Sequence, residues 1–152
     1  MGLSDIGLIW TFTVLANFFF NLGIGILFIY KSKKTNARLL GYFGLYIIFA
    51  GLCWTGILID IFSIVLTGTN VEIPNNFISV IGYFWMAPSG LMIMIISAEI
   101  VLPNKKWILI GSFTLLAVIY EILIFVDPIN SFSVEYPQNP GESLIYDYIV
   151  LE

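Results

Sequence analysis

Four long apolar stretches, separated by short polar breaks, constrain the fold of this chain more than any other feature of its sequence. The stretches cover residues 6–30, 39–67, 77–102 and 107–126. An α-helix needs about 20 apolar residues to cross the hydrocarbon core of a bilayer, and each stretch is long enough. We therefore predict an all-α integral membrane protein. Its residues 1–127 should form a four-helix antiparallel bundle, because short breaks force consecutive helices to run in opposite directions.

The overall composition agrees with a membrane environment. Hydrophobic residues make up 59% of the 152 residues and charged residues 11%, whereas soluble domains average about 45–50% and about 25%. A water-soluble chain of this length could not bury so much apolar surface. The lipid bilayer is therefore the first partner that the sequence predicts.

The positions of the basic residues predict the orientation of the four helices. All six fall in the first and third breaks, which lie on the same side of a four-span protein. Because cytoplasmic loops collect lysine and arginine, we expect a multi-pass protein of the cell membrane with these breaks in the cytoplasm and both termini outside. The six residues are Lys31, Lys33, Lys34, Arg38, Lys105 and Lys106.

Three local features of the third stretch have structural interpretations. Pro88 predicts a kink, because proline removes a hydrogen bond of the helix. Glu99 lies near the basic break, where pairing with a lysine or reaching the membrane surface explains it. The aromatic residues 83–85 lie towards the outer end and fit an interfacial belt.

The last part of the chain, residues 128–152, differs in composition from the four stretches. Its first part, "DPINSFSVEYPQNPGE", is rich in turn formers and predicts an external tail. The following "SLIYDYIVLE" is apolar but too short to span. Two alternatives remain open for it: a segment at the membrane surface, or the start of a further helix at Glu142 or Ser143.

Two acidic residues lie inside the apolar stretches, Asp60 in the second and Glu121 in the fourth. Each shares its helix face with small or polar residues, since residues three, four and seven apart lie on one face. Asn17 and Asn21 belong to a similar polar face of the first stretch. Small and polar residues mark contacts between membrane helices, so we expect these three faces to meet.

The depth of these residues predicts a site. At a rise of 1.5 Å per residue, Asp60 and Glu121 reach a similar level in the outer half of the membrane, and Asn17 lies near the middle. Acidic residues inside a membrane are costly and commonly functional. The sequence thus predicts an outward-facing polar pocket lined by Asp60, Glu121, Asn17 and Asn21 for a cation, a proton or an amine-bearing ligand. The alternative is that each acid is protonated or bonded to a neighbouring polar group and is only structural.

Sequence motifs for the common catalytic chemistries are absent. The chain has no histidine, no metal-ligand spacing, no phosphate-binding loop and no dinucleotide fingerprint. Its basic residues are few and dispersed, which argues against binding to nucleic acid. We therefore expect no enzyme activity, no cofactor, no metal site and no nucleic-acid partner.

One pattern resembles a known kind of protein. The segment "NFFFNLGIGILFIYKSKKTNARLLGYF", followed in the next stretch by "WTGILID", resembles the opening helices of prokaryotic seven-helix, sensor-like membrane proteins. Some of these are attached to sensor kinases. The resemblance implies that this chain is a half-length relative or a piece of a longer protein, and that a second copy would complete the bundle.

Three classes of function remain open on the sequence. The first is a membrane protein that binds or senses a small ligand in the outward-facing pocket. The second is a component of a proton- or cation-coupled transporter, working as a homo-oligomer. The third is a structural subunit that assembles with partner membrane proteins.

Overall fold

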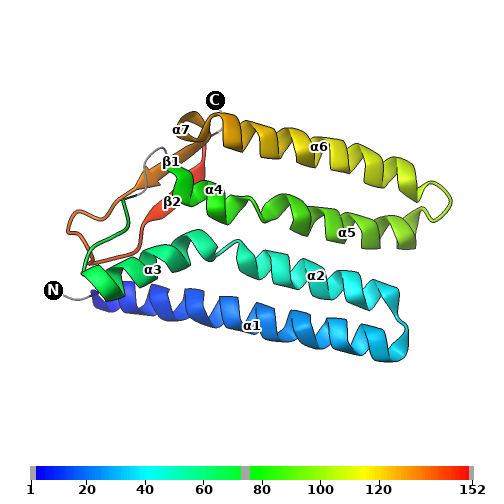
Figure 1. Ribbon diagram of the computed structural model, residues 1–152, viewed down its shortest axis with the longest axis horizontal. Coiled ribbons are helices and arrows are strands. Elements are labelled where there is room, and N and C mark those ends of the chain that lie inside the picture. Colours follow the sequence, from blue (N-terminus) through cyan, green and yellow to red (C-terminus); the bar gives the residue numbers. More distant parts are fainter. Residues whose placement is uncertain (1–2, 73–75, 151–152) are drawn as a thin grey trace.

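The structure, a computed structural model, describes residues 3–72 and 76–150 and is built mainly of α-helices (Figure 1). The all-α prediction is confirmed at this level, although a small two-stranded sheet lies at one end. The helices are α1 Asp5–Thr35, α2 Arg38–Leu52, α3 Thr55–Thr67, α4 Phe77–Tyr83, α5 Met86–Val101, α6 Lys106–Val126 and α7 Pro128–Ser131.

Three helical segments in the described part of the chain are long and apolar enough to cross a membrane: α1, the segment Phe77–Val101 that contains α4 and α5, and α6. A fourth is added if α2 and α3, which are bent by 42° at their junction, count as one broken span. The four apolar stretches of the sequence therefore correspond to four helical segments, two of them interrupted.

The ends of α1 follow from its sequence. Ser4 caps the N-terminus, because its hydroxyl oxygen accepts a hydrogen bond from the Gly7 N–H at 3.2 Å. Asn36 ends the helix in the left-handed conformation, with φ of 53°. Lysines in the last turn complement the negative end of the helix dipole. The basic break thus terminates the helix as well as carrying charge.

The helical segments lie side by side in the order of the sequence (Figure 1). Helix α1 packs on α2, α2 packs on α5, and α5 packs on α6, so the segments form one row. Among the described elements, α1 and α6 occupy opposite edges of this row and do not pack on each other. The polar faces of the first and fourth stretches are consequently far apart.

Two of the four segments are interrupted at nearly the same distance from the basic turns, since α2 has 15 residues and α5 has 16. Helix α2 ends at Leu52 and α3 begins at Thr55. The Thr55 hydroxyl donates to the carbonyls of Leu52 at 2.7 Å and of Ile81, in α4, at 3.2 Å. This side chain therefore satisfies backbone groups at the break and joins the two segments.

The second interruption separates α4 from α5 at residues 84–85. Pro88 lies in the first turn of α5, where its missing N–H leaves the carbonyl of Phe84 without its usual helical partner and its ring crowds that carbonyl. The helix is interrupted one turn before the proline for this reason, at the place where Pro88 predicts a disturbance.

A small cap, which we define as residues 128–150, covers one end of the row. It contains α7 and the antiparallel strands β1 Phe132–Glu135 and β2 Tyr146–Ile149, with Phe132 opposite Ile149. The helix start suggested at Glu142 or Ser143 is not formed, because "YDYI" is extended against β1. Aromatic and β-branched residues favour this pairing. Residues 151–152 of the predicted tail lie outside the described residues.

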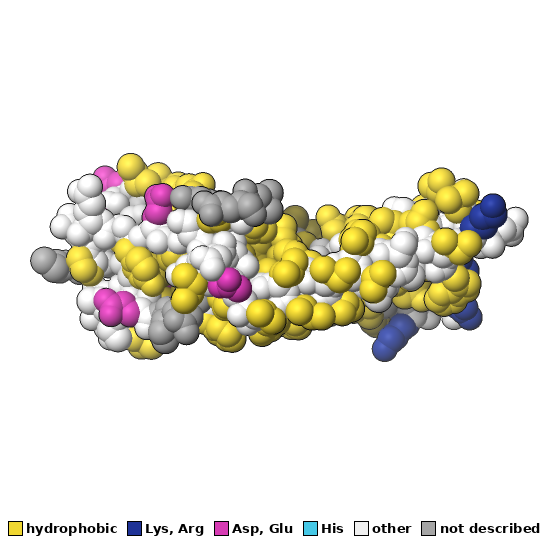
Figure 2. All heavy atoms as spheres, turned by 90° about the horizontal axis from the view of Figure 1, so that it is seen from above, with side chains coloured by type: hydrophobic (Ala, Val, Ile, Leu, Met, Phe, Trp, Pro, Cys, Tyr) yellow, Lys and Arg dark blue, Asp and Glu magenta, His cyan; other side chains and the backbone are white. Residues whose placement is uncertain are grey.

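Apolar side chains of the cap pack onto the helix ends. Phe132 is buried with Val80 of α4 and Ile124 of α6, and Leu144 is buried with a cluster that includes Ile61 of α3. We call this the cap end of the molecule, and the opposite end, which carries the two basic turns, the basic end. Figure 2 shows lysine and arginine at the basic end and acidic side chains gathered towards the cap end.

Candidate functional site

Asp60 is fully buried in α3, with an exposed fraction of 0%. Its carboxylate accepts hydrogen bonds from the Asn70 side-chain amide at 3.0 and 3.3 Å, from the Val71 N–H at 2.9 Å and from the Ile145 N–H at 3.0 Å. All of these donors are uncharged. Asp60 therefore holds the loop after α3 and the cap together, as a carboxylate whose charge is solvated by amides and not by a cation.

Asn70 extends this network and was missed by the sequence reasoning. Its amide nitrogen also donates to the Ser143 carbonyl at 2.8 Å, and its oxygen accepts from the Gly141 N–H at 2.7 Å. An asparagine two residues beyond a helix-ending glycine is an ordinary turn signal. Nothing local to it indicates a bond to an acid inside the preceding helix.

The other predicted site residues lie elsewhere. Asn17 is exposed on α1 and donates to the Thr13 carbonyl, while Asn21 donates to the Asn17 carbonyl at 2.8 Å. Both carboxylate oxygens of Glu121, on α6, are buried without a hydrogen-bond partner within the described residues. None of the hydrogen bonds found between described residues joins Asp60 to Glu121, Asn17 or Asn21.

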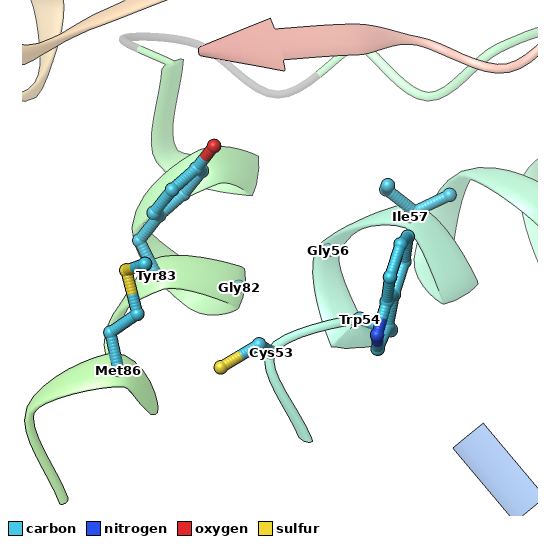
Figure 3. Close-up of a pocket in the computed structure, with 7 residues that line it drawn as sticks. All are labelled: Cys53, Trp54, Gly56, Ile57, Gly82, Tyr83 and Met86. Carbon is cyan, nitrogen blue, oxygen red and sulfur yellow. The ribbon is translucent and has the colours of Figure 1, made fainter. Parts of the chain in front are cut away.

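A cavity lies instead between the two helix interruptions, where the α2–α3 break faces the α4–α5 break (Figure 3). It measures about 230 Å³. The helices touch beside it, since a Cβ on Gly56 would lie 2.6 Å from the Ile78 carbonyl oxygen. In Figure 3 the Cys53 side chain points into the gap, towards the helix segments that carry Tyr83 and Met86. The cavity is lined by Cys53, Trp54, Gly56, Ile57, Gly82, Tyr83 and Met86.

A second cavity of about 480 Å³ adjoins the first and continues beneath the cap. The two share Trp54, Ile57 and Tyr83 as lining residues. Trp10 and Tyr146 meet edge to face at its wall, with ring centroids 6.3 Å apart. The second cavity is lined by Trp10, Trp54, Ile57, Tyr83, Ser143, Leu144, Ile145 and Tyr146. We refer to the two adjoining cavities together as the aromatic pocket.

The aromatic pocket was not foreseen because no local signal marks it. Tyr83 was assigned to an interfacial belt, and the break at Cys53 and Trp54 carries neither proline nor an unusual backbone angle. The pocket arises where two breaks in different helices come to the same level, and sequence periodicity cannot show that coincidence. The aromatic residues of a helix break next to a mid-span cysteine are the only hint that the sequence offers.

Among the described residues, the charged side chains at the cap end are acidic. Asp60 lies directly behind the pocket wall, because its carboxylate accepts a hydrogen bond from the N–H of Ile145, which is a lining residue. At the surface of the cap, burial raises the pKa of the Tyr136 hydroxyl, and the carboxylates of Glu72 and Asp60 raise it further. A further negative charge is therefore disfavoured at the cap end.

The lining determines what the pocket can hold. Most of the lining is apolar or aromatic. Its polar side-chain groups are the hydroxyls of Tyr83, Ser143 and Tyr146, the indole N–H groups of Trp10 and Trp54, and the Cys53 thiol. Such a site suits a small ligand with an apolar body and one polar end. Comparison with protein-family models, with curated proteins and with solved structures found no match to this chain.

Proposed function

We propose that this chain is a multi-pass protein of the cell membrane that binds a small ligand in the aromatic pocket from the outside. In this proposal the four helical segments cross the bilayer as an antiparallel set, with the basic end in the cytoplasm and the cap and both termini outside. The distribution of lysine and arginine supports this orientation. We propose no catalytic role, cofactor or nucleic-acid partner.

The observation that carries the proposal is the pair of helix breaks facing each other across a cavity. Interrupted backbone at membrane depth is tolerated where it is buried in protein or lines a cavity. Two interruptions at one level, each with an aromatic side chain on the cavity wall, favour a binding site over an accident of packing. The cap, held by Asp60 and Asn70, forms the outer wall.

Cys53 provides the experiment, because it is the one cysteine of the chain and lines the inner part of the pocket. In the purified protein in lipid nanodiscs, methyl methanethiosulfonate should modify Cys53. Ile57→Trp should slow that reaction by about tenfold or more, because the larger ring fills the path to the thiol. The rate is measured by mass spectrometry of the intact protein.

The control is Leu66→Trp, on the same helix but 80% exposed and outside the pocket. Cys53 of this variant should react at the same rate as Cys53 of the protein without substitutions. If Ile57→Trp also reacts at that rate, the reagent reaches Cys53 from the lipid and the pocket proposal is wrong.

A sensing role is the extension that the resemblance to sensor-like proteins implies. A ligand between the breaks would contact both α3 and α4, so its binding would be coupled to the 42° bend between α2 and α3. A change in this bend would be transmitted at the basic end to a cytoplasmic signalling partner or to a second copy of the chain.

A second candidate, a proton- or cation-coupled transporter component, is favoured by Glu121. Both of its carboxylate oxygens are buried without a hydrogen-bond partner in the described residues, and such a group within a membrane is costly unless it takes up a proton or a cation. Proton entry into liposomes that enclose a pH-sensitive dye would be lost in Glu121→Gln. If Glu121→Gln changes only the stability, the structural-subunit alternative is favoured.

A further inference from the structure

We propose that the aromatic pocket selects an organic cation, of the quaternary ammonium class with an apolar body. This inference rests on the proposed function and adds the chemistry of the ligand. It draws on two independent observations: the rings that line the pocket, and a negative charge behind its wall that forms no ion pair with any described residue.

The rings are the first observation. Trp10, Trp54, Tyr83 and Tyr146 all line the part of the pocket beneath the cap. The face of an aromatic ring attracts a cation, most strongly for tryptophan, and several rings together form the sites that hold quaternary ammonium groups. The four rings around this cavity provide faces of this kind.

The absence of carboxylates among the described lining residues narrows the class of cation that the pocket would take. The described lining residues include no aspartate or glutamate. A primary ammonium carries three N–H donors that must all be satisfied when it leaves water. A quaternary ammonium carries no donor, so it loses no hydrogen bonds on entering a cavity walled by rings and aliphatic side chains.

The buried charge is the second observation. Asp60 accepts hydrogen bonds only from uncharged donors, and one of them, the Ile145 N–H, belongs to the pocket wall. All six lysine and arginine residues lie at the basic end of the molecule. Since a buried charge is little screened by salt, the carboxylate imposes a negative potential on the pocket. A cation is attracted there, and an anion is repelled.

Two reagents of opposite charge measure this potential at Cys53. Trimethylammonioethyl and sulfonatoethyl methanethiosulfonate share one reaction: the thiolate attacks the sulfenyl sulfur, a disulfide forms and methanesulfinate leaves. Each rate is divided by the rate of the same reagent with a free thiol in solution, so that only the effect of the site remains. We expect the cationic reagent to react faster than the anionic one by about tenfold or more, because a nearby carboxylate attracts the first and repels the second.

Variants separate charge from aromatic contact. Asp60→Asn should reduce the cation-to-anion ratio several-fold. Because this substitution also affects the cap, Trp54→Leu serves as a second test. It leaves Asp60 in place and removes a ring, and it should also reduce the cation-to-anion ratio. Its matched control is Trp107→Leu, at the basic end and 75% exposed, which should leave the ratio unchanged.

Protection of Cys53 then tests the ligand class. Choline should slow its modification by methyl methanethiosulfonate at a concentration about tenfold below that of 3,3-dimethylbutan-1-ol, its uncharged isostere, and Trp54→Leu should remove this advantage. Equal protection by the two compounds, or protection by neither, overturns the inference. The pocket proposal is judged separately, by the effect of Ile57→Trp.

The cation could come from a free solute or from a lipid headgroup. Nanodiscs of phosphatidylglycerol, with and without phosphatidylcholine, distinguish these sources. Slower modification of Cys53 in phosphatidylcholine identifies the headgroup as the occupant. Equal rates, together with protection by choline, identify a free quaternary ammonium compound.

Discussion

At the scale of single residues, Asp60 shows how far an acid in an apolar stretch can be interpreted. An acid in such a stretch is expected to have polar partners in the protein, because lipid cannot solvate its carboxylate. In the structure the Asp60 carboxylate does have polar partners. The partners, however, are Asn70, Val71 and Ile145 of the loop and cap, and not the polar faces of the first and fourth stretches. Glu99, in contrast, pairs with Lys106 at 2.7 Å, as its position near the basic break indicated.

Removal of the Asn70 side chain should destabilise the protein strongly. Asn70→Ala deletes two hydrogen bonds to Asp60 and leaves the Ser143 carbonyl and the Gly141 N–H without their partner. We expect a loss of about 2–4 kcal/mol in the free energy of unfolding, because a buried charged acceptor loses donors. Thermal unfolding in detergent gives the size of the loss, and limited proteolysis shows whether the cap opens first.

Asn130→Ala is the matched control, since Asn130 also donates to an aspartate, Asp127, at 2.7 Å. Both residues of that pair are exposed, so the change should cost less than about 0.5 kcal/mol. Equal losses in the two variants would show that burial of the Asp60 network has no special effect on stability.

At the scale of helices, close backbone contact explains why neighbouring segments pack as they do. A Cβ on Gly44 would lie 2.7 Å from the Gly25 carbonyl oxygen, and Asn21 lies against Gly51 in the same interface. Small residues permit this approach, and membrane helices associate through such surfaces. The polar face of α1 thus packs partly on α2, which is its sequence neighbour.

Gly25→Ala should therefore weaken the contact between α1 and α2. Its Cβ would lie 2.5 Å from Ile48 Cγ1 and 2.8 Å from the Gly44 carbonyl oxygen, which belongs to the backbone and cannot rotate away. We expect a loss of about 1–3 kcal/mol in stability from this overpacking, measured by thermal unfolding.

Gly23→Ala, two residues away on the same helix, tests the geometry directly. Apart from the backbone of α1 itself, no described atom lies within 4 Å of the Cβ that it would add. It should therefore be neutral or raise stability by up to about 1 kcal/mol through its better helix propensity. A loss in Gly23→Ala equal to that in Gly25→Ala would argue against the close contact as the cause.

At the scale of the whole molecule, two properties stand out: the row of helices and the separation of charge along it (Figure 2). The row leaves two broad faces of exposed apolar side chains, for example Phe62 and Leu123 at about 60% exposure. Lipid would cover such faces, and so would the membrane partner or second copy that the sequence suggests. The charge separation supports the proposed orientation.

Cysteines placed at the two ends in a Cys53→Ser background test that orientation. A membrane-impermeant maleimide added to intact cells should label Gln138→Cys, in the cap, and should not label Thr35→Cys, at the basic end, because the basic turns are expected in the cytoplasm. Labelling is detected by gel shift, and Thr35→Cys should react fully once the cells are opened. Labelling of Thr35→Cys in intact cells would reverse the proposed topology.

The sequence by itself determined the apolar helical stretches, their approximate bounds, the helix interruption before Pro88 and the confinement of the basic residues to one end. Hydropathy, proline geometry and charge are properties of a short window, so they need no knowledge of distant contacts. The tertiary structure alone decided the partners of Asp60, which include a residue 85 positions later in the chain. It also decided that residues 146–149 form a strand and that two helix breaks enclose the aromatic pocket. Each of these depends on which distant segments come together, and packing, not local preference, determines that.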